Sequence, residues 1–358
     1  MPLVSPFETS FGRISERECI VISIFSEGLV GYGECVADRD PGYAYETTGT
    51  AWHILRDFLI PAILGKDIKS ADEYQEIVSE VRGHLMAKAS LEMALWDLFG
   101  KAQEKSLRTL FQGERQKVDV GVSIGLQNSP QALAKVVSEY LEQGYGRIKL
   151  KIKPGRDLGD VSIIRGSFPE IRLQVDANSA YTLDTAQTLL QLDNFNLLMI
   201  EQPLGDTDIV DHSFLQKEIT TPICLDESIL SVEDARKAIK IGACKIINIK
   251  PGRVGGISES KKIHDFCQDN NIGVWCGGLL ETGIGRAFNI ALSSLPGFKY
   301  PADMSPSSFF YKEDLIDPTY EVDKNGYIAI PTATGLGYNL EMKRINKYTK
   351  QKYNTRAY

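Results

Sequence analysis

Charged residues end one predicted strand after another at a nearly constant interval along the middle of this chain. They are Lys151, Asp176, Glu201, Asp226 and Lys250, in the segments RIKLKIK, RLQVDAN, LLMIEQP, PICLDES and KIINIKP. The intervals between them are 25, 25, 25 and 24 residues. Because one strand followed by one helix has about this length, the interval predicts a series of strand–helix units and a parallel sheet.

The strand–helix alternation extends from about Lys117 to Asp303. Its candidate strands are VDVGVSIG, the five segments above, GVWCGG and a short strand near residues 299–303, with helical patterns of ten to fifteen residues between them. Eight such strands indicate a modified TIM (β/α) barrel of the α/β class rather than an open sheet. We place this barrel at residues 116–304.

The first 115 residues have a different pattern. Residues 18–35 alternate apolar and polar side chains across a Glu-Gly turn and predict an antiparallel hairpin, and residues 47–64 and 71–101 carry the spacing of helices. After Asp303 the chain becomes loops with one short strand, YIAIP. We therefore expect an α+β capping domain formed by residues 1–115 and completed by the C-terminal tail, residues 305–358.

Charge and composition argue against several kinds of partner. The chain has 40 basic and 47 acidic residues, a net charge of −7, and no run of five lysines and arginines. We therefore expect that it does not bind nucleic acid. No apolar stretch reaches the roughly 18 residues that span a bilayer, and the N-terminus lacks the layout of a signal peptide. We therefore expect that the protein does not associate with a membrane and that it is located in the cytoplasm. The six cysteines show no CxxC spacing, which argues against a zinc cluster or a disulfide framework. Whether the protein forms a homo-oligomer stays open.

In a barrel of this kind the carboxyl ends of all strands face one mouth, so the charged strand ends should converge on a single site. Taken alone, an acidic residue after an apolar strand is usually a helix cap or a solvated loop residue. Three carboxylates on adjacent strands would repel one another strongly unless a cation lay between them. Asp176, Glu201 and Asp226 are therefore the predicted ligands of a divalent metal, and oxygen ligands favour Mg²⁺ first and Mn²⁺ second.

Lys151 and Lys250 flank these carboxylates. Two lysines across a divalent metal suit removal of a proton from the carbon next to a carboxylate, since the metal stabilises the enediolate and one lysine acts as the base. Lys149 would also face inward as a supporting charge, whereas Lys153 would lie at the rim. Glu227 has two interpretations, as a group that orients a lysine or a water molecule and as a residue in the first turn of a helix.

Five motifs resemble the muconate lactonising subgroup of the enolase superfamily, and most closely its o-succinylbenzoate synthase and N-acylamino acid racemase branch. They are KLK from residue 149, VDAN from 175, IEQP from 200, LDES from 225 and IKPGRVGG from 249. The segments WCGGLLETGIGRAFNIALSSLP from Trp275 and DMSPSSFFYKEDL from Asp303 are also similar to this branch. Dipeptide epimerases have Asp-x-Asp near the eighth strand, whereas Asp303 here is followed by Met304 and Ser305.

The resemblance implies that Lys151 is the base and Lys250 its partner. It places Tyr43 in a mobile loop that closes over the barrel, and it implies substrate contacts at Ser123, Asn178, Gly278, Leu279 and Leu280. The family begins with a further strand before the equivalent of MPLVSPF. We therefore expect either that translation starts upstream of Met1 or that the cap lacks an edge strand.

The activity implied by the resemblance is that of an o-succinylbenzoate synthase, a lyase that dehydrates 2-succinyl-6-hydroxy-2,4-cyclohexadiene-1-carboxylate in menaquinone biosynthesis. Lys151 would remove the α-proton and then protonate the departing hydroxide, while Lys250 stabilises the anion from the opposite face. The alternative is racemisation of N-acylamino acids, for which Lys250 must deliver a proton to that face. Because the same charged residues serve both reactions, they do not separate the two.

Two other classes of function are open to this sequence. GVSIG at 121–125 matches the G-x-S-x-G elbow of a serine hydrolase, with Ser123 as nucleophile and Asp226 and His264 following in the required order. An elbow needs a helix directly after its serine, whereas LQN precedes the helix cap at Ser129, which argues against a hydrolase. A barrel that had lost its catalytic function would be expected to lack one of the charged strand ends, and none is missing.

Overall fold

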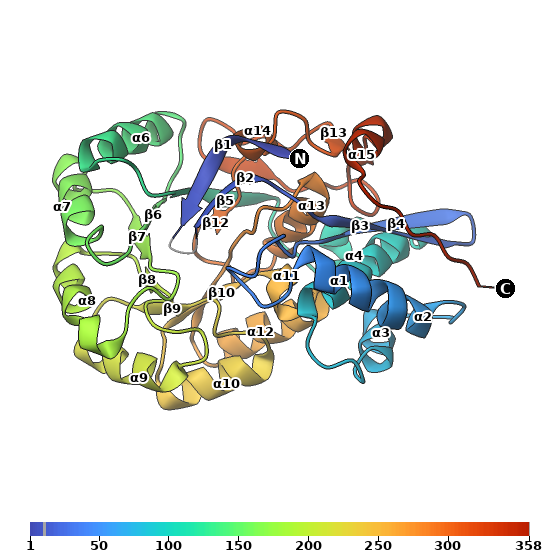
Figure 1. Cartoon of the computed structure of the whole chain (residues 1–358), viewed down its shortest axis with the longest axis horizontal. Coiled ribbons are helices and arrows are strands. Elements are labelled where there is room, and N and C mark those ends of the chain that lie inside the picture. Colours follow the sequence, from blue (N-terminus) through green and yellow to red (C-terminus); the bar gives the residue numbers. More distant parts are fainter. Residues whose placement is uncertain (10–11, 358) are drawn as a thin grey trace.

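The computed structural model describes residues 1–9 and 12–357, which form a barrel with a cap beside it (Figure 1). The barrel strands are hydrogen-bonded in the order β11-β10-β9-β8-β7-β6-β5-β12, each parallel to the next. Their bounds are β5 Lys117–Ile124, β6 Ile148–Lys151, β7 Leu173–Asp176, β8 Ile200–Glu201, β9 Ile223–Leu225, β10 Ile246–Ile249, β11 Gly273–Cys276 and β12 Ala302–Asp303. A parallel bridge between Val274 and Phe298 brings the two ends of this order together. The predicted barrel is confirmed.

The register of the strands sets the charged strand ends at one level. Lys151 pairs with Asp176, and Asp176 pairs with Glu201. Further round the barrel, Ile247 of β10 pairs with Leu225 of β9, so Lys250 and Asp226 both leave their strands at this same end. The strand ends therefore converge, as the parallel arrangement requires.

Helices form a ring outside the strands (Figure 1). They are α6 Pro130–Glu142, α7 Leu158–Ser167, α8 Gln187–Leu192, α9 Ile209–Glu218, α10 Val232–Ile241, α11 Pro251–Val254, α12 Ile257–Asp269 and α13 Gly283–Leu292, with short 3₁₀ turns at Leu183–Thr185 and Asp193–Phe195. Several of these helices begin after a residue whose side chain accepts a hydrogen bond from a backbone N–H of the first turn. For example, the Ser129 hydroxyl accepts a hydrogen bond from the Ala132 N–H at 3.1 Å at the start of α6.

The cap consists of two hairpins and a group of helices. Its elements are β1 Pro2–Thr9, β2 Gly12–Glu16, β3 Ile20–Ser26, β4 Leu29–Cys35, α1 Thr48–Ile54, a π-helical stretch Leu55–Leu59, α2 Ile60–Ile63, α3 Ala71–Ile77, α4 Leu85–Ala102 and α5 Leu107–Phe111. The hairpin predicted over residues 18–35 is confirmed, since β3 and β4 are antiparallel. The helical spacing over residues 71–101 corresponds to two helices, α3 and α4, and Gly83 (φ +67°) and His84 (φ +53°) take the left-handed backbone conformation between them.

The tail contacts both parts of the molecule. It contains α14 Ser307–Phe310, β13 Ile316–Asp317, β14 Tyr327–Ala329, β15 Asn339–Leu340 and α15 Met342–Tyr348. The predicted YIAIP strand is β14, which pairs with β5 of the barrel, whereas the Leu336 N–H bonds to the Asp97 carboxylate of α4 at 2.7 Å. The division of the chain near residue 115 stays a prediction. Among the described residues, no helix combines the length and the apolar character needed to cross a membrane.

Two glycines let the β3–β4 hairpin lie directly on α4. A Cβ atom added to Gly31 would lie 2.1 Å from the carbonyl oxygen of Ala94, and one added to Gly33 would lie 2.1 Å from that of Ser90. Neither backbone can move away without breaking the contact between the hairpin and the helix. Glycine is therefore required at both positions by close approach.

Gly33→Ala is expected to lower the free energy of unfolding by about 1–3 kcal/mol, because the added methyl group overpacks this contact. Denaturant unfolding measures the change. Gly166→Ala is the matched control, since nothing lies within 4 Å of a Cβ added at this position in α7. Equal unfolding midpoints for the two variants would contradict the packing described here.

Carboxylates of the cap lie at the starts of barrel helices. Both oxygens of Glu34 in β4 accept from the Thr282 N–H, at 3.0 and 3.2 Å, and one also accepts from the Gly285 N–H at 2.8 Å, at the start of α13. Glu92 of α4 accepts from the Ser258 N–H at 3.0 Å at the start of α12. Free N–H groups and the helix dipole favour a carboxylate at a helix N-terminus. These contacts hold the cap against the mouth of the barrel.

Candidate active site

The charged strand ends meet in a buried cluster at the barrel mouth. Asp176 is 1% exposed, Glu201 and Asp226 are fully buried, and Lys250 is 5% exposed. The three lysines of the RIKLKIK segment differ in position. The Lys149 side chain is 3% exposed and that of Lys151 is 9% exposed, whereas Lys153 lies beyond the end of β6 and is half-buried.

On one side of the mouth, Lys151 lies against two oxygen acceptors. Its Nζ donates to Asp176 Oδ2 and Asn178 Oδ1, each at 2.6 Å. Asp176 Oδ1 accepts from the Asn178 N–H at 3.0 Å. Burial raises the pKa of Asp176, but the neighbouring Lys151 and Lys149 outweigh burial and lower that pKa to about 2. Asp176 is therefore a carboxylate whose charge balances the lysines beside it.

On the opposite side, Asp226 is surrounded by cations. Lys250 Nζ lies 2.7 Å from Asp226 Oδ2, and the Arg253 guanidinium contacts Asp226 Oδ1. The Tyr43 hydroxyl donates to Asp226 Oδ1 at 3.2 Å and accepts from Lys250 Nζ at 3.2 Å. Burial lowers the pKa of Lys250, but Tyr43 and the carboxylates of Glu201, Glu227 and Asp176 outweigh burial and raise it. Lys250 is therefore an ammonium group.

Between these two sides, Glu201 is held by amides and by Lys149. Its Oε2 accepts from Gln174 Nε2 at 2.8 Å and its Oε1 from Asn248 Nδ2 at 2.8 Å. Lys149 Nζ lies 3.2 Å from both Glu201 Oε2 and Asp176 Oδ2. Lys149 thus bridges two of the predicted metal ligands, in agreement with its predicted inward position.

The side chains, as they lie in residues 1–9 and 12–357, include no group of three or more acidic, histidine or cysteine residues arranged to hold a metal ion. Asp176 forms an ion pair with Lys151, and Asp226 forms ion pairs with Lys250 and Arg253. The chemistry of the donors nevertheless fits a divalent cation. Oxygen atoms of Gln174, Asn248 and Glu227 are buried around the carboxylates without a hydrogen-bond partner, and such acceptors suit a hard cation.

Glu227 lies in the loop between β9 and α10, so its interpretation as a first-turn helix residue is wrong. Its Oε1 accepts from Asn178 Nδ2 at 2.9 Å. Burial raises the pKa of Glu227 to about 7, although the nearby Lys250 opposes the shift. Because Asn178 also accepts from Lys151, its side chain joins Lys151 to Glu227 across the mouth. The backbone of Asn178 has a left-handed φ of +43°.

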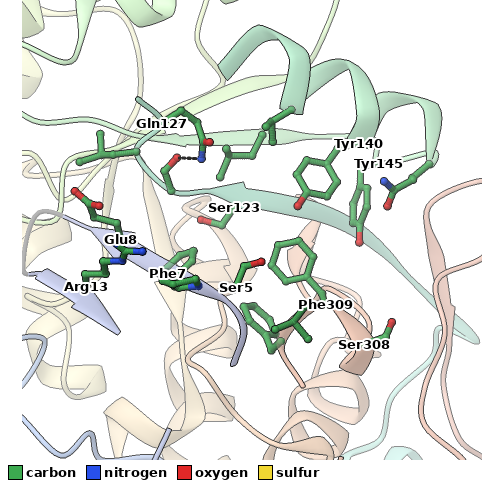
Figure 2. A pocket seen from close by; sticks show the side chains of 18 of the residues that line it. Ser5, Phe7, Glu8, Arg13, Ser123, Gln127, Tyr140, Tyr145, Ser308 and Phe309 are labelled. Atoms are coloured by element: carbon green, nitrogen blue, oxygen red, sulfur yellow. Dashed lines mark hydrogen bonds between the residues drawn. The ribbon is translucent and has the colours of Figure 1, made fainter. Parts of the chain in front are cut away.

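Ser123 lies in β5, level with Lys149, and its hydroxyl is buried without a hydrogen-bond partner. It faces a cavity of about 630 Å³ that β1, α6, α14 and the loop after β5 enclose, but whose lining includes neither Lys151 nor Lys250. Figure 2 shows Ser123 between Phe7 of β1 and Tyr140 of α6. The predicted contribution of Ser123 to substrate binding stays a prediction.

The hydrolase alternative does not fit this geometry. Ser123 lies within a strand, and α6 begins only at Pro130. His264 of α12 accepts from the Gly297 N–H at 3.0 Å through Nε2, and its Nδ1 lies 2.7 Å from Asp265. Asp226 is occupied by Lys250 and Arg253, so no Ser-His-Asp triad forms.

The loop Gly278–Leu280 after β11 lies between the barrel and the cap. A Cβ added to Gly278 would lie 2.4 Å from the Arg286 guanidinium, so glycine is required there. Leu279 packs against the core cluster of the cap, against which Tyr43 also packs. The loop therefore lies next to the cap segment predicted to close over the barrel.

Two residues of this cluster were missed by the sequence analysis. Asp303 ends β12, and its Oδ2 lies 2.8 Å from Lys149 Nζ. The rule that selected the other strand ends would also have selected Asp303 had it been applied to the last strand. Arg253, inside the IKPGRVGG motif, gave no comparable signal because it does not end a strand. Burial lowers the pKa of Lys149, but Asp303, Glu201 and Asp176 outweigh burial and raise it.

Both parts of the chain match known families. Residues 1–111 match the mandelate racemase / muconate lactonizing enzyme N-terminal domain, and residues 132–344 match the enolase C-terminal domain-like family. The chain is 47% identical to an o-succinylbenzoate synthase of Geobacillus kaustophilus, over 98% of this chain and 93% of that protein. It is also 47% identical to an N-succinylamino acid racemase of Amycolatopsis sp, over 94% of this chain and 91% of that protein.

A solved structure has the same fold. The crystal structure of an enolase superfamily member from Listeria innocua superposes with a TM-score of 0.95 at 44% identity, over 98% of this chain and 95% of that chain. This similarity extends over the cap as well as the barrel.

Proposed function

Because this chain belongs to the mandelate racemase / muconate lactonizing enzyme family of the enolase superfamily, we propose that it is an o-succinylbenzoate synthase. It would be a carbon–oxygen lyase that dehydrates 2-succinyl-6-hydroxy-2,4-cyclohexadiene-1-carboxylate to o-succinylbenzoate in menaquinone biosynthesis. The observation that carries the proposal is the position of Lys151 in β6 and Lys250 directly after β10, half a turn apart in an eight-stranded barrel. The cytoplasmic location stays a prediction.

Lys151 takes the α-proton of the substrate in this proposal. Its Nζ is held at the barrel mouth by Asp176 and Asn178, so a proton acceptor has a fixed position there. The C–H bond breaks and its electron pair becomes part of the new ring double bond as the C–O bond breaks. Lys151 then returns the proton to the departing hydroxide, which leaves as water.

Lys250 acts from the other face of the substrate. It is a buried ammonium group, so its positive charge stabilises the negative charge that develops when Lys151 removes the proton. Tyr43 and Asp226 fix its position through contacts at 3.2 and 2.7 Å. No proton transfer by Lys250 is needed for dehydration.

Enzymes of the enolase superfamily use a divalent metal ion. We assign its ligands here to Asp176, Glu201 and Asp226, and we propose Mg²⁺ because all three donors are hard oxygen atoms. When bound, the cation supplies Lewis-acid stabilisation of the substrate carboxylate. Lys149 and Asp303 then balance charge beneath these ligands, since each is ion-paired within the cluster.

Racemisation of N-succinylamino acids is the second candidate. The position of Lys250 on the opposite side of the barrel from Lys151 is compatible with it, because a protonated group there can deliver a proton to the second face of the α-carbon. The similarity to a racemase at 47% identity supports the same alternative. Dehydration needs one lysine that transfers protons, whereas racemisation needs two.

The test is proton NMR in D2O with Mg²⁺, comparing the dehydration substrate with an N-succinylamino acid. We expect fast dehydration beside slower α-deuteration, and EDTA should abolish both until Mg²⁺ is restored. The reverse ranking would make racemisation the main activity. Absence of both reactions in the folded, Mg²⁺-loaded protein would overturn the proposed function.

A further inference from the structure

Arg17 joins the cap to the barrel at a point between two predicted substrate-contacting loops. It follows β2, is 2% exposed, and donates from its guanidinium in two directions. Toward the cap it bonds to the carbonyl oxygens of Val36 and Ala37 and to the Asp38 carboxylate. Toward the barrel its Nε donates to the carbonyl oxygen of Leu280 at 3.1 Å.

The cap side of this contact is the base of the loop that carries Tyr43. The Thr48 N–H donates to the carbonyl oxygen of Asp38 at 2.7 Å and so closes the loop between residues 38 and 48. At the other end of the loop, the Tyr43 hydroxyl reaches Asp226 and Lys250. A shift of the loop base would therefore move a side chain that contacts the charged cluster.

The barrel side is the end of the loop Gly278–Leu280. The carbonyl oxygen of Leu280 accepts a second hydrogen bond, from the Tyr311 hydroxyl at 2.7 Å. Leu279 packs with Tyr43 against the same core cluster of the cap. The Arg17 guanidinium thus connects two segments that both pack against this cluster.

Burying a guanidinium is costly unless its donors are satisfied, and here backbone carbonyls satisfy most of them. Such a rigid, planar group fixes the distance between the segments that it joins. No described contact connects Arg17 with Lys151, Lys250 or the predicted metal ligands. Its effect on the reaction must therefore pass through the two loops.

We infer that Arg17 is a positioning residue that sets the spacing between the Tyr43 loop and the loop Gly278–Leu280, and thereby selects among carboxylate substrates. This inference rests on the proposed function for the identity of the substrates. The spacing acts on how a substrate is held and not on the proton transfer itself.

The test uses Arg17→Lys, which keeps the charge but loses the planar fork. Loss of hydrogen bonds from a charged group to two loops is expected to raise KM about tenfold, with kcat changed less than about threefold. The ratio of kcat/KM for dehydration to that for racemisation should also change, since the substrates differ in shape.

Arg344→Lys is the matched control, because Arg344 also donates to backbone carbonyls, those of Asp314 and Ile316, in the C-terminal tail. It should leave KM and the substrate ratio unchanged. Tyr311→Phe is a milder second variant that removes one bond to the Leu280 carbonyl oxygen. It should raise KM about threefold. In the double variant with Arg17→Lys, the increase in KM should be smaller than the product of the two single increases, because both residues donate to this acceptor.

Hydrogen–deuterium exchange separates this inference from the proposed function. Arg17→Lys should speed amide exchange in residues 38–48 and 278–280 and leave α6 unchanged, whatever substrate the protein turns over. Unchanged exchange in either loop, or unchanged KM in a folded and active Arg17→Lys protein, would overturn the inference. Inactivity of the wild type toward both substrates would overturn the proposed function, and the exchange result would still decide the role of Arg17.

Discussion

Asp226→Asn is expected to weaken Mg²⁺ binding by about 100-fold or more. Loss of a group that only supports a metal ligand costs 10–100-fold, and Asp226 is a proposed ligand itself. Its carboxylate is fully buried against Lys250 and the Arg253 guanidinium. An amide at this position removes the negative charge and leaves two buried cations facing the incoming metal ion.

Isothermal titration calorimetry measures the effect on the metal-free protein. Asp269→Asn, at the end of α12, makes the same chemical change at an exposed position and should bind Mg²⁺ as the wild type does. Removing one partner of a buried ion pair costs about 3–5 kcal/mol of stability, so circular dichroism must first establish that Asp226→Asn is folded. Glu201→Gln, whose single amide oxygen can accept only one of the hydrogen bonds from Gln174 and Asn248, gives a second determination. Wild-type affinity in a folded Asp226→Asn protein would rule out Asp226 as a ligand.

The barrel and its charged mouth were predictable from the sequence because two simple periodicities coincide there. Parallel strands place their carboxyl ends at one level, and the interval of about 25 residues identifies which charged residues occupy those ends. Alternation along β6 then orients Lys149 and Lys151 toward the interior. The structure bears this out for the position of both side chains, with Lys153 outside the strand.

The residues that the sequence analysis missed depend on contacts between distant segments. Asp303 ends the short strand predicted near residues 299–303, to which the strand-end rule was not applied, and its partner Lys149 lies more than 150 positions away. Arg253 reaches Asp226 from the short helix α11, so no strand rule applies to it. The helix break at His84 was missed because apolar spacing does not report a left-handed backbone conformation.

The contacts between the cap and the barrel could not be predicted from the sequence either. Glu34 lies in the predicted hairpin, and Glu92 lies in a predicted helix. Each carboxylate accepts hydrogen bonds from N–H groups at the start of a barrel helix that is far along the chain. Periodicity describes which face of an element is apolar, but it does not identify the partner of a buried charge. Arg17 is another example, because its acceptors are mostly backbone carbonyls.

Lys151→Ala is expected to lower the turnover of the dehydration substrate by about 10²–10⁴-fold, because the variant lacks the group that removes and returns the proton. Its Nζ contacts Asp176 and Asn178, so the change leaves two oxygen acceptors without this donor but does not remove a metal ligand. Mg²⁺ affinity should therefore not fall. Lys153→Ala, two positions further along the same segment and outside β6, should keep wild-type turnover.

The central claim is that Lys151 is the base of a metal-dependent dehydration at this barrel mouth. The measurement that tests it most directly is the turnover number of Mg²⁺-saturated Lys151→Ala on 2-succinyl-6-hydroxy-2,4-cyclohexadiene-1-carboxylate, followed by the appearance of o-succinylbenzoate. We predict a value about a hundredth of the wild-type turnover or less, with Lys153→Ala unchanged. A value of about a tenth or more would leave too small a loss for a general base and would contradict the assignment.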